Sequence, residues 1–255
     1  MKTIWKVLII FLGVLLVGFT LWVILLKQDV EPGAAREQML RDLSAPKDVV
    51  IVFNSGGWGN TPLGQATDFT PVLAGIQDSL SQLGYSSVII PFVRTPRGLA
   101  GKIEDIKDYL ESFKYSSEAM ANEVQFILAS FPGKRVIIAG FSNGGGLTER
   151  AMKGLADRPG VDAIVAGVPR WYQNYTSNRI LVLDNNGKDK LADGDIRAIA
   201  AAVIKAPFRW LQAKIGHRAM NFARAIEIPG HEYLWSSSEV GPPIVDFIDA
   251  SFNHR

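Results

Sequence analysis

The chain has 255 residues, 47% of them hydrophobic, and it contains no cysteine, which excludes disulfides, thiolate metal sites and a thiol nucleophile and suits an exported domain. It has 27 Lys and Arg and 25 Asp and Glu, and once Lys2 and Lys6 are set aside the two counts are equal. A nucleic-acid-binding protein would carry a basic excess, so the composition argues against a nucleic-acid partner.

The first element along the chain is an apolar segment. Val7–Leu26 is a run of 20 residues without a charge, which at 1.5 Å per residue matches a hydrocarbon core of about 30 Å. We therefore predict a transmembrane signal-anchor over residues 1–27. Lys2 and Lys6 precede it, which predicts a cytoplasmic N-terminus and an extracytoplasmic domain at the cell membrane. The alternative is a secreted protein cleaved after Ala34-Ala35, although signal peptides usually have a shorter apolar region.

A polar segment follows, and it predicts a tether over residues 28–46. From there to the C-terminus, short β-branched runs alternate with longer amphipathic segments. Six runs are predicted strands: Val49–Phe53, Val88–Ile90, Val136–Ile138, Ala163–Val165, Ile180–Leu183 and Ala225–Ile228. Their spacing predicts an α/β domain over residues 47–255, with a mostly parallel sheet of about six strands and helices on both faces.

Two predicted helices have clear boundaries. Thr70-Pro71 is typical of an N-cap followed by proline in the first turn, and Gly84 of a helix end. In the second helix, apolar residues recur at helical spacing before Pro132-Gly133, which predicts a face packed on the core: Met120, Val124, Ile127, Leu128 and Phe131. The stretch from Arg94 to Ser117 is long enough for a cap, and we expect Arg94 and Arg97 to be solvated there rather than to bind an anionic headgroup.

Ser142 lies between Gly140 and Gly144, after a predicted strand and before a predicted helix. This pattern is typical of a nucleophile elbow, a strained turn that exposes the serine hydroxyl. With this motif, residues 47–252 resemble the α/β-hydrolase superfamily. The resemblance implies a serine hydrolase that needs no metal or organic cofactor. The alternative is a glycine-rich turn that cradles a phosphate, but the lysine of a P-loop is missing.

The serine needs a base and an acid. Of the three histidines, His217 falls in a helical stretch and His254 is the penultimate residue, whereas His231 follows the last predicted strand. The carboxyl ends of strands are where α/β proteins bind ligands, so we predict His231 as the base. The resemblance points to Asp189 as the acid, with Asp184 and Asp193 as alternatives. Asp193 or Asp195 could instead cap a following helix.

The oxyanion needs backbone N–H donors. The resemblance points to the amide of Asn143, directly after the nucleophile, and to the loop after the first strand, where Trp58 is the first choice and Gly57 the second. Trp171, Tyr172 and Tyr175 could line an acyl pocket or be ordinary half-buried aromatics.

The sequence thus predicts a membrane-anchored serine hydrolase that cleaves a small-molecule or lipid carboxylic ester through an acyl-enzyme, with catalytic residues Ser142, His231 and Asp189. Two alternatives stay open: an acyltransferase that uses the same triad, and an inactive binding module that retains the fold.

Overall fold

The computed structural model describes residues 41, 43–57, 59, 63–66, 69–94, 105–173, 175–216, 220 and 225–253. The predicted signal-anchor, most of the predicted tether and four of the residues discussed above lie outside this part of the chain: Trp58, Arg97, His217 and His254. Among the residues that the structure describes, no helix has both the length and the apolar composition needed to cross a bilayer. Leu43, near the end of the predicted tether, is fully buried in the core.

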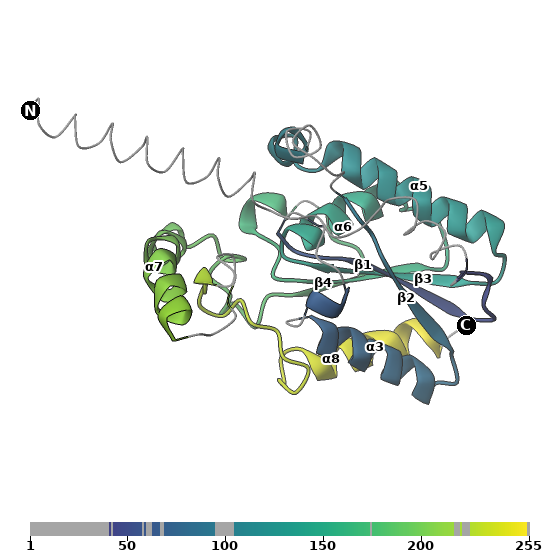
Figure 1. Cartoon of the computed structure of the whole chain (residues 1–255). Helices are drawn as coiled ribbons and strands as arrows, with labels where there is room; N and C mark the ends of the chain where they lie inside the picture. The colour runs from purple at the N-terminus through teal and green to yellow at the C-terminus, as the bar shows by residue number, and fades with distance from the viewer. Residues whose placement is uncertain are drawn as a thin grey trace, which may run out of the picture.

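The centre of the domain is a parallel sheet (Figure 1). Its five strands are β1 (Val49–Asn54), β2 (Ser87–Pro91), β3 (Arg135–Phe141), β4 (Val161–Ala166) and β5 (Ile180–Leu183). They lie in the order β2-β1-β3-β4-β5, and every neighbouring pair is parallel. Five of the six predicted strands are therefore confirmed, as is the parallel arrangement.

The sixth predicted strand, Ala225–Ile228, is wrong. Its alternating residues fit a strand locally, but they pair with no strand of the described sheet. Instead, the carbonyl oxygens of Ala225 and Glu227 each accept a hydrogen bond from Arg209 Nη1, at 3.5 Å. A side chain thus occupies the backbone acceptors that a neighbouring strand would have used.

Helices cover both faces of the sheet, as predicted (Figure 1). The bounds of the main helices are α3 (Thr70–Gln82), α5 (Lys114–Ser130), α6 (Asn143–Gly154), α7 (Ile196–Ile215) and α8 (Gly241–Phe252). α5 and α6 lie on one face and α3 and α8 on the other, while α7 stands apart at the left of Figure 1. Two 3-10 turns, η1 (Leu63–Gln65) and η2 (Arg170–Tyr172), lie in the connections.

Successive side chains of β1 point to opposite faces of the sheet, which explains how one sheet supports two hydrophobic cores. Val50 and Val52 belong to the hydrophobic cluster under α5 and α6, whereas Ile51 and Phe53 belong to the cluster under α3 and α8. All six residues of β1 are buried. A strand covered on both faces has no solvent side, which is why β1 is apolar from Val49 to Phe53.

The predicted helix boundaries hold with one difference. α3 begins at Thr70 with Pro71 in its first turn, and Gly84, with φ +85°, follows its end. Phe69 rather than Thr70 is the N-cap residue, because the Thr70 hydroxyl donates to the carbonyl of Ala66, at 2.8 Å, instead of accepting from the helix. The predicted core face of α5 is confirmed: Met120, Val124 and Ile127 are fully buried, and Leu128 and Phe131 pack beside them.

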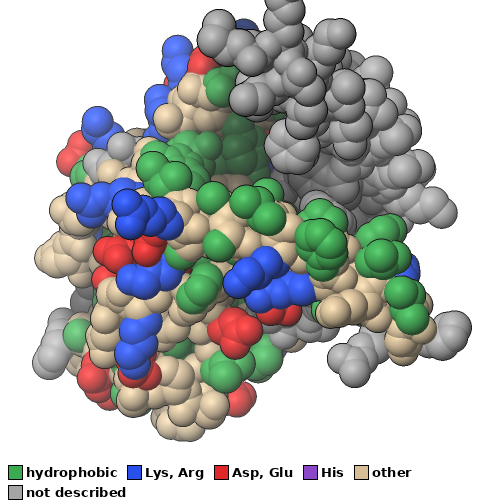
Figure 2. All heavy atoms as spheres, turned by 90° about the vertical axis from the view of Figure 1, so that its left-hand side faces the viewer, with side chains coloured by type: hydrophobic (Ala, Val, Ile, Leu, Met, Phe, Trp, Pro, Cys, Tyr) green, Lys and Arg blue, Asp and Glu red, His purple; other side chains and the backbone are tan. Residues whose placement is uncertain are grey.

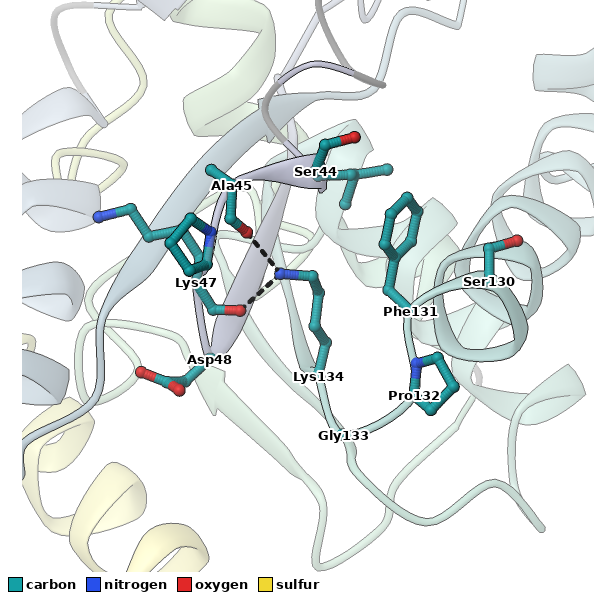
Figure 3. A pocket seen from close by; sticks show the side chains of 11 residues that line it. Ser44, Ala45, Lys47, Asp48, Ser130, Phe131, Pro132, Gly133 and Lys134 are labelled. Atoms are coloured by element: carbon teal, nitrogen blue, oxygen red, sulfur yellow. Dashed lines mark hydrogen bonds between the residues drawn. The ribbon is translucent and has the colours of Figure 1, made fainter.

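A hollow lined by residues 43–48 and 130–134 lies where β1 and β3 begin (Figure 3). Lys134 Nζ crosses it and donates to the carbonyl oxygens of Ala45, at 3.0 Å, and Lys47, at 2.6 Å. These bonds fasten the segment before β1 to the start of β3. The hollow is at the amino ends of the strands, whereas ligands of α/β sheets bind at the carboxyl ends.

The strand order narrows the expected position of a ligand site along the carboxyl-end edge of the sheet. From β1 the chain moves outward to β2, then returns to add β3 on the other side of β1. The direction of winding therefore reverses between β1 and β3. In open α/β sheets the crevice outside the carboxyl ends at such a switch point is the usual ligand site. The loops that leave β1 and β3 there carry Asn54–Gly57 and Ser142.

Candidate active site

Ser142 occupies a strained turn between β3 and α6. Its φ and ψ are 54° and −123°, a conformation that non-glycine residues rarely adopt. The amide of Ser142 donates to the carbonyl of Ala166, the last residue of β4, at 2.8 Å. A Cβ on Gly140 would lie 2.5 Å from Thr148 Oγ1. The predicted elbow geometry is therefore present, with a glycine where the following helix crosses the strand.

His231 is held by Asp189. Nδ1 of His231 lies 2.8 Å from Oδ2 of Asp189. The carboxylate can only accept, so Nδ1 carries the proton of the neutral imidazole and Nε2 is its basic atom. The ring also stacks on Phe141, the residue before the serine, with 5.0 Å between ring centroids. The structure thus joins two of the predicted catalytic residues in the arrangement that orients a general base.

Asp189 is fully buried and accepts four hydrogen bonds. Oδ1 accepts from the amides of Leu191, at 2.8 Å, and Ala192, at 3.2 Å, while Oδ2 accepts from His231 and from the hydroxyl of Tyr233, at 2.7 Å. Burial raises the pKa of Asp189, but the His231, Tyr233 and Leu191 bonds outweigh it and hold this pKa below its ordinary value. The group is an ionised acceptor, as an orienting acid must be.

The alternative acids lie elsewhere. Asp184 is exposed, and Asp193 pairs with Lys190 at 3.2 Å with its side chain 55% exposed. Asp195 is the N-cap of α7, where its side chain accepts from the amide of Ala198 at 3.0 Å, as one of the two predicted caps. Among these carboxylates, only Asp189 contacts a histidine within the described part of the chain.

Tyr233 was not predicted, although it lies only two residues after His231. It is 2% exposed, and burial followed by the negative charge of Asp189 raises its pKa, so the hydroxyl stays protonated and donates. Gly167 was missed as well. It has φ +64°, and a Cβ there would lie 2.6 Å from His231 Cε1. The absence of a side chain at Gly167 is what leaves room for the imidazole.

Ser142 and the His231–Asp189 pair converge on the same edge of the sheet. The amide of Ser142 is hydrogen-bonded to the carbonyl of Ala166. The imidazole of His231 lies against Gly167, the residue after Ala166. The structure has no hydrogen bond from the Ser142 hydroxyl to His231 among the described contacts. Such bonds are often long in a free enzyme and tighten when substrate binds.

Backbone donors meet at the same point. Asn143 begins α6, and its amide has no acceptor within the described part of the chain, as expected for the first turn of a helix. The loop after β1 packs directly on the elbow: a Cβ on Gly56 would lie 3.1 Å from Ser142 Cβ, and one on Gly144 would collide with the carbonyl of Asn54. Gly57, one of the two predicted loop donors, lies in this loop with φ +60°. Trp58, the other, is outside the described residues.

Arg94 and Tyr109 hold that loop, which sequence reasoning did not anticipate. The Gly57 carbonyl accepts from Arg94 Nη2, at 2.6 Å, and from the Tyr109 hydroxyl. The same hydroxyl accepts from Asn143 Nδ2 at 2.9 Å, so it links Gly57 and Asn143, two of the three residues predicted as oxyanion donors. Burial raises the pKa of Tyr109 to about 12.

The expectation that Arg94 is solvated is wrong. Its side chain is fully buried and lies over the rings of Tyr109 and Phe113, 5.4 and 5.1 Å from their centroids. Asp105 balances its charge at 3.9 Å. These partners all come from residues 105–113, part of the stretch predicted as a cap. A buried arginine needs such partners, and none of them is adjacent to it in sequence.

The three aromatic residues after β4 differ in environment. Trp171 is 52% exposed, whereas Tyr172 is half-buried, lies 4.6 Å from Phe113 between ring centroids, and covers Gly146 of α6. Tyr175 packs on the core. Within the described ranges, no group of three or more His, Asp or Glu side chains is arranged to hold a metal ion.

No protein-family model matches the sequence, and no curated protein matches it. Among solved structures, the chain is similar to a Trichoderma reesei cutinase in complex with a C11Y4 phosphonate inhibitor, with 19% identity, a TM-score of 0.42, and coverage of 64% of this chain and 74% of that one. It is also similar to a cutinase-like protein from Cryptococcus sp., with 17% identity, a TM-score of 0.31, and coverage of 52% and 73%. Both neighbours are cutinases or cutinase-like proteins.

Proposed function

We propose that this chain is a serine hydrolase that cleaves a carboxylic ester with Ser142, His231 and Asp189 as its catalytic residues. The observation that carries the proposal is the strained serine at the switch point of the sheet, on the same edge as a histidine bonded to a buried carboxylate at 2.8 Å. Strain of this kind persists where it serves a function.

In the proposed reaction, Ser142 Oγ attacks the ester carbonyl carbon while His231 Nε2 accepts the hydroxyl proton. The carbonyl oxygen becomes an oxyanion, which accepts hydrogen bonds from the amide of Asn143 and from the loop amides at Gly57 and Trp58. Collapse of this intermediate expels the alcohol, which takes the proton from His231. Water then attacks the acyl carbon with His231 again as the base; the bond from that carbon to Ser142 Oγ breaks, Oγ regains the proton from His231, and the acid product leaves.

A fluorophosphonate probe tests the nucleophile on the full chain in detergent micelles. We expect a stable adduct on Ser142, found by peptide mapping. Labelling should be lost in Ser142→Ala and strongly slowed in His231→Ala, with both variants as folded as the wild type by circular dichroism. Folded wild-type protein that takes no label, or a label that persists in Ser142→Ala, would refute the assignment. Ester turnover by the wild type, with and without an added alcohol, then separates hydrolysis from acyl transfer, and the two variants serve as inactive controls.

We also propose that residues 1–27 anchor the enzyme in the cell membrane with the catalytic domain extracytoplasmic. The support is the uncharged run Val7–Leu26 and the lysines that precede it. Membranes from expressing cells should retain the full chain after an alkaline carbonate wash, and protease added outside intact spheroplasts should digest it. Release of a shortened chain into the medium would instead support cleavage after Ala34-Ala35.

A further inference from the structure

α7 exposes its large apolar residues instead of packing them against the domain. The residues that it buries are three alanines, Ala202, Ala206 and Ala213. Its large apolar side chains face outward, with the following exposed fractions: Ile196 77%, Val203 48%, Ile204 67%, Phe208 69%, Leu211 52% and Ile215 73%. A surface helix normally turns such residues toward the core. This outward face is the outer stripe of α7.

The stripe is continuous along the helix. Ile196, Ile204, Phe208, Leu211 and Ile215 follow one another at intervals of three, four or eight residues, and Ala200 fills the longest interval. Side chains at these intervals share one face of an α-helix. About half of the large apolar residues that are exposed in the described chain belong to this one helix. Contiguous apolar surface of this kind marks an interaction site.

The charges on α7 indicate the partner. Within Ile196–Ile215 there are four basic residues and no acidic one, in a chain whose basic and acidic residues are otherwise nearly equal in number. Arg209 is turned inward and pairs with Glu227 at 3.3 Å, while Arg197, Lys205 and Lys214 are exposed. Figure 2, which views the molecule from the side of α7, shows hydrophobic side chains beside Lys and Arg side chains.

We propose that α7 is an interfacial helix that docks the domain on an anionic lipid surface. Phe208 and Leu211 would enter the boundary between headgroups and acyl chains, and Lys205 and Lys214 would contact lipid phosphates. An amphipathic basic helix with aromatic and aliphatic residues on one face binds a bilayer in this way. Its four basic residues prevent α7 from crossing the bilayer, so it lies along the surface.

The position of α7 in the chain gives the docking a consequence for the active site. Asp195, six residues after the acid Asp189, caps its first turn, and the segment after α7 leads back to His231. Arg209 fastens that returning segment to α7 through the carbonyls of Ala225 and Glu227. A docked α7 therefore brings the loops that carry the proposed acid and base close to the lipid surface.

The absence of cysteine allows one spin label to be placed at a time on the full chain. Ile204→Cys, Phe208→Cys and Leu211→Cys report on the outer stripe, and Ala119→Cys, at an exposed position of α5, is the matched control. Each labelled protein is reconstituted at one copy per nanodisc, in phosphatidylcholine with or without phosphatidylglycerol. Collisions of the label with oxygen, which concentrates in lipid, and with a water-soluble nickel chelate are then measured.

Docking predicts high oxygen and low nickel accessibility at the three stripe positions in phosphatidylglycerol discs, and the reverse at position 119. Lys205→Gln and Lys214→Gln should each lower the ratio of docked to undocked protein about fivefold, since one basic residue contributes that much near an anionic surface. Lys153→Gln on α6 removes the same charge elsewhere and should have no effect. Low accessibility to both reagents would mean that protein covers the stripe, and high nickel accessibility that water does. Either result would overturn the proposal.

Discussion

The exchange Asp189→Asn is the most direct test of the proposed acid. Because Oδ1 of Asp189 accepts the amides of Leu191 and Ala192, an asparagine would keep its carbonyl oxygen there and turn its NH₂ group toward His231. That group only donates, so His231 Nδ1 would have to accept, and the imidazole proton would move to Nε2. Nε2 could then no longer take the proton of Ser142.

We expect kcat to fall about 10⁴-fold, which is the usual effect of the wrong histidine tautomer in a serine triad. This decrease corresponds to a loss of about 5.5 kcal/mol of transition-state stabilisation. KM should change little, because Asp189 is buried away from substrate. The assay is steady-state hydrolysis of a short-chain p-nitrophenyl ester, with thermal unfolding as the check on folding. Asp184→Asn and Asp193→Asn, at exposed positions of the same loop, are the matched controls and should stay close to wild type. A folded Asp189→Asn with wild-type kcat, beside an inactive Asp184→Asn, would show that the acid was misassigned.

Three further exchanges or conditions test neighbouring features. Tyr109→Phe removes the hydroxyl that bridges the Gly57 carbonyl and α6, so kcat should fall about fivefold to tenfold with KM unchanged, the worth of about one hydrogen bond; an unchanged kcat would show that the loop holds without it. Gly167→Ala places a Cβ 2.6 Å from His231 Cε1, and the displaced imidazole should lower kcat about 10²-fold in a protein that still folds. The pKa of Asp189 is lower in the folded protein than in the unfolded chain. The stability that this carboxylate contributes is therefore complete above its unfolded pKa of about 3.9 and is lost as pH falls through its folded pKa. The urea midpoint should fall more steeply in acid for the wild type than for Asp189→Asn, and parallel curves would contradict the lowered pKa.

The sequence predicted those parts of the fold that depend on local pattern. The predicted runs within β1, β3 and β4 are visible because the interior of a strand buried on both faces is apolar, and the elbow is visible because a strained serine needs glycine beside it. Ala225–Ile228 has the same local pattern without being a strand. Whether such a run joins a sheet depends on a free neighbouring edge, and here Arg209 bonds the carbonyls instead.

Contacts between side chains that are far apart in the chain could not be predicted from the sequence. Arg94 lies in a loop just after a predicted strand, and a charged loop residue is expected to be solvated. Its burial depends on the rings and carboxylate that residues 105–113 bring over it. Tyr233 is similar: a tyrosine near a histidine is unremarkable until the fold brings Asp189 against both. In each case the pairing of distant segments determines the role.

The two loops of the site depend on each other in a way that neither motif shows alone. β1 and β3 are neighbours in register, with Asn54 opposite Gly140, so the loop after β1 must pass directly over the elbow. The carbonyls of Asn54 and Ser55 occupy the space where a Cβ on Gly144 would lie, and Asn54 Nδ2 donates to the Gly144 carbonyl at 2.8 Å. Gly144 therefore allows both the sharp turn at Ser142 and the close approach of the loop after β1. Because both contacts meet in one residue, the spacing between Ser142 and the loop after β1 is set by backbone contact, which side-chain motion cannot relax.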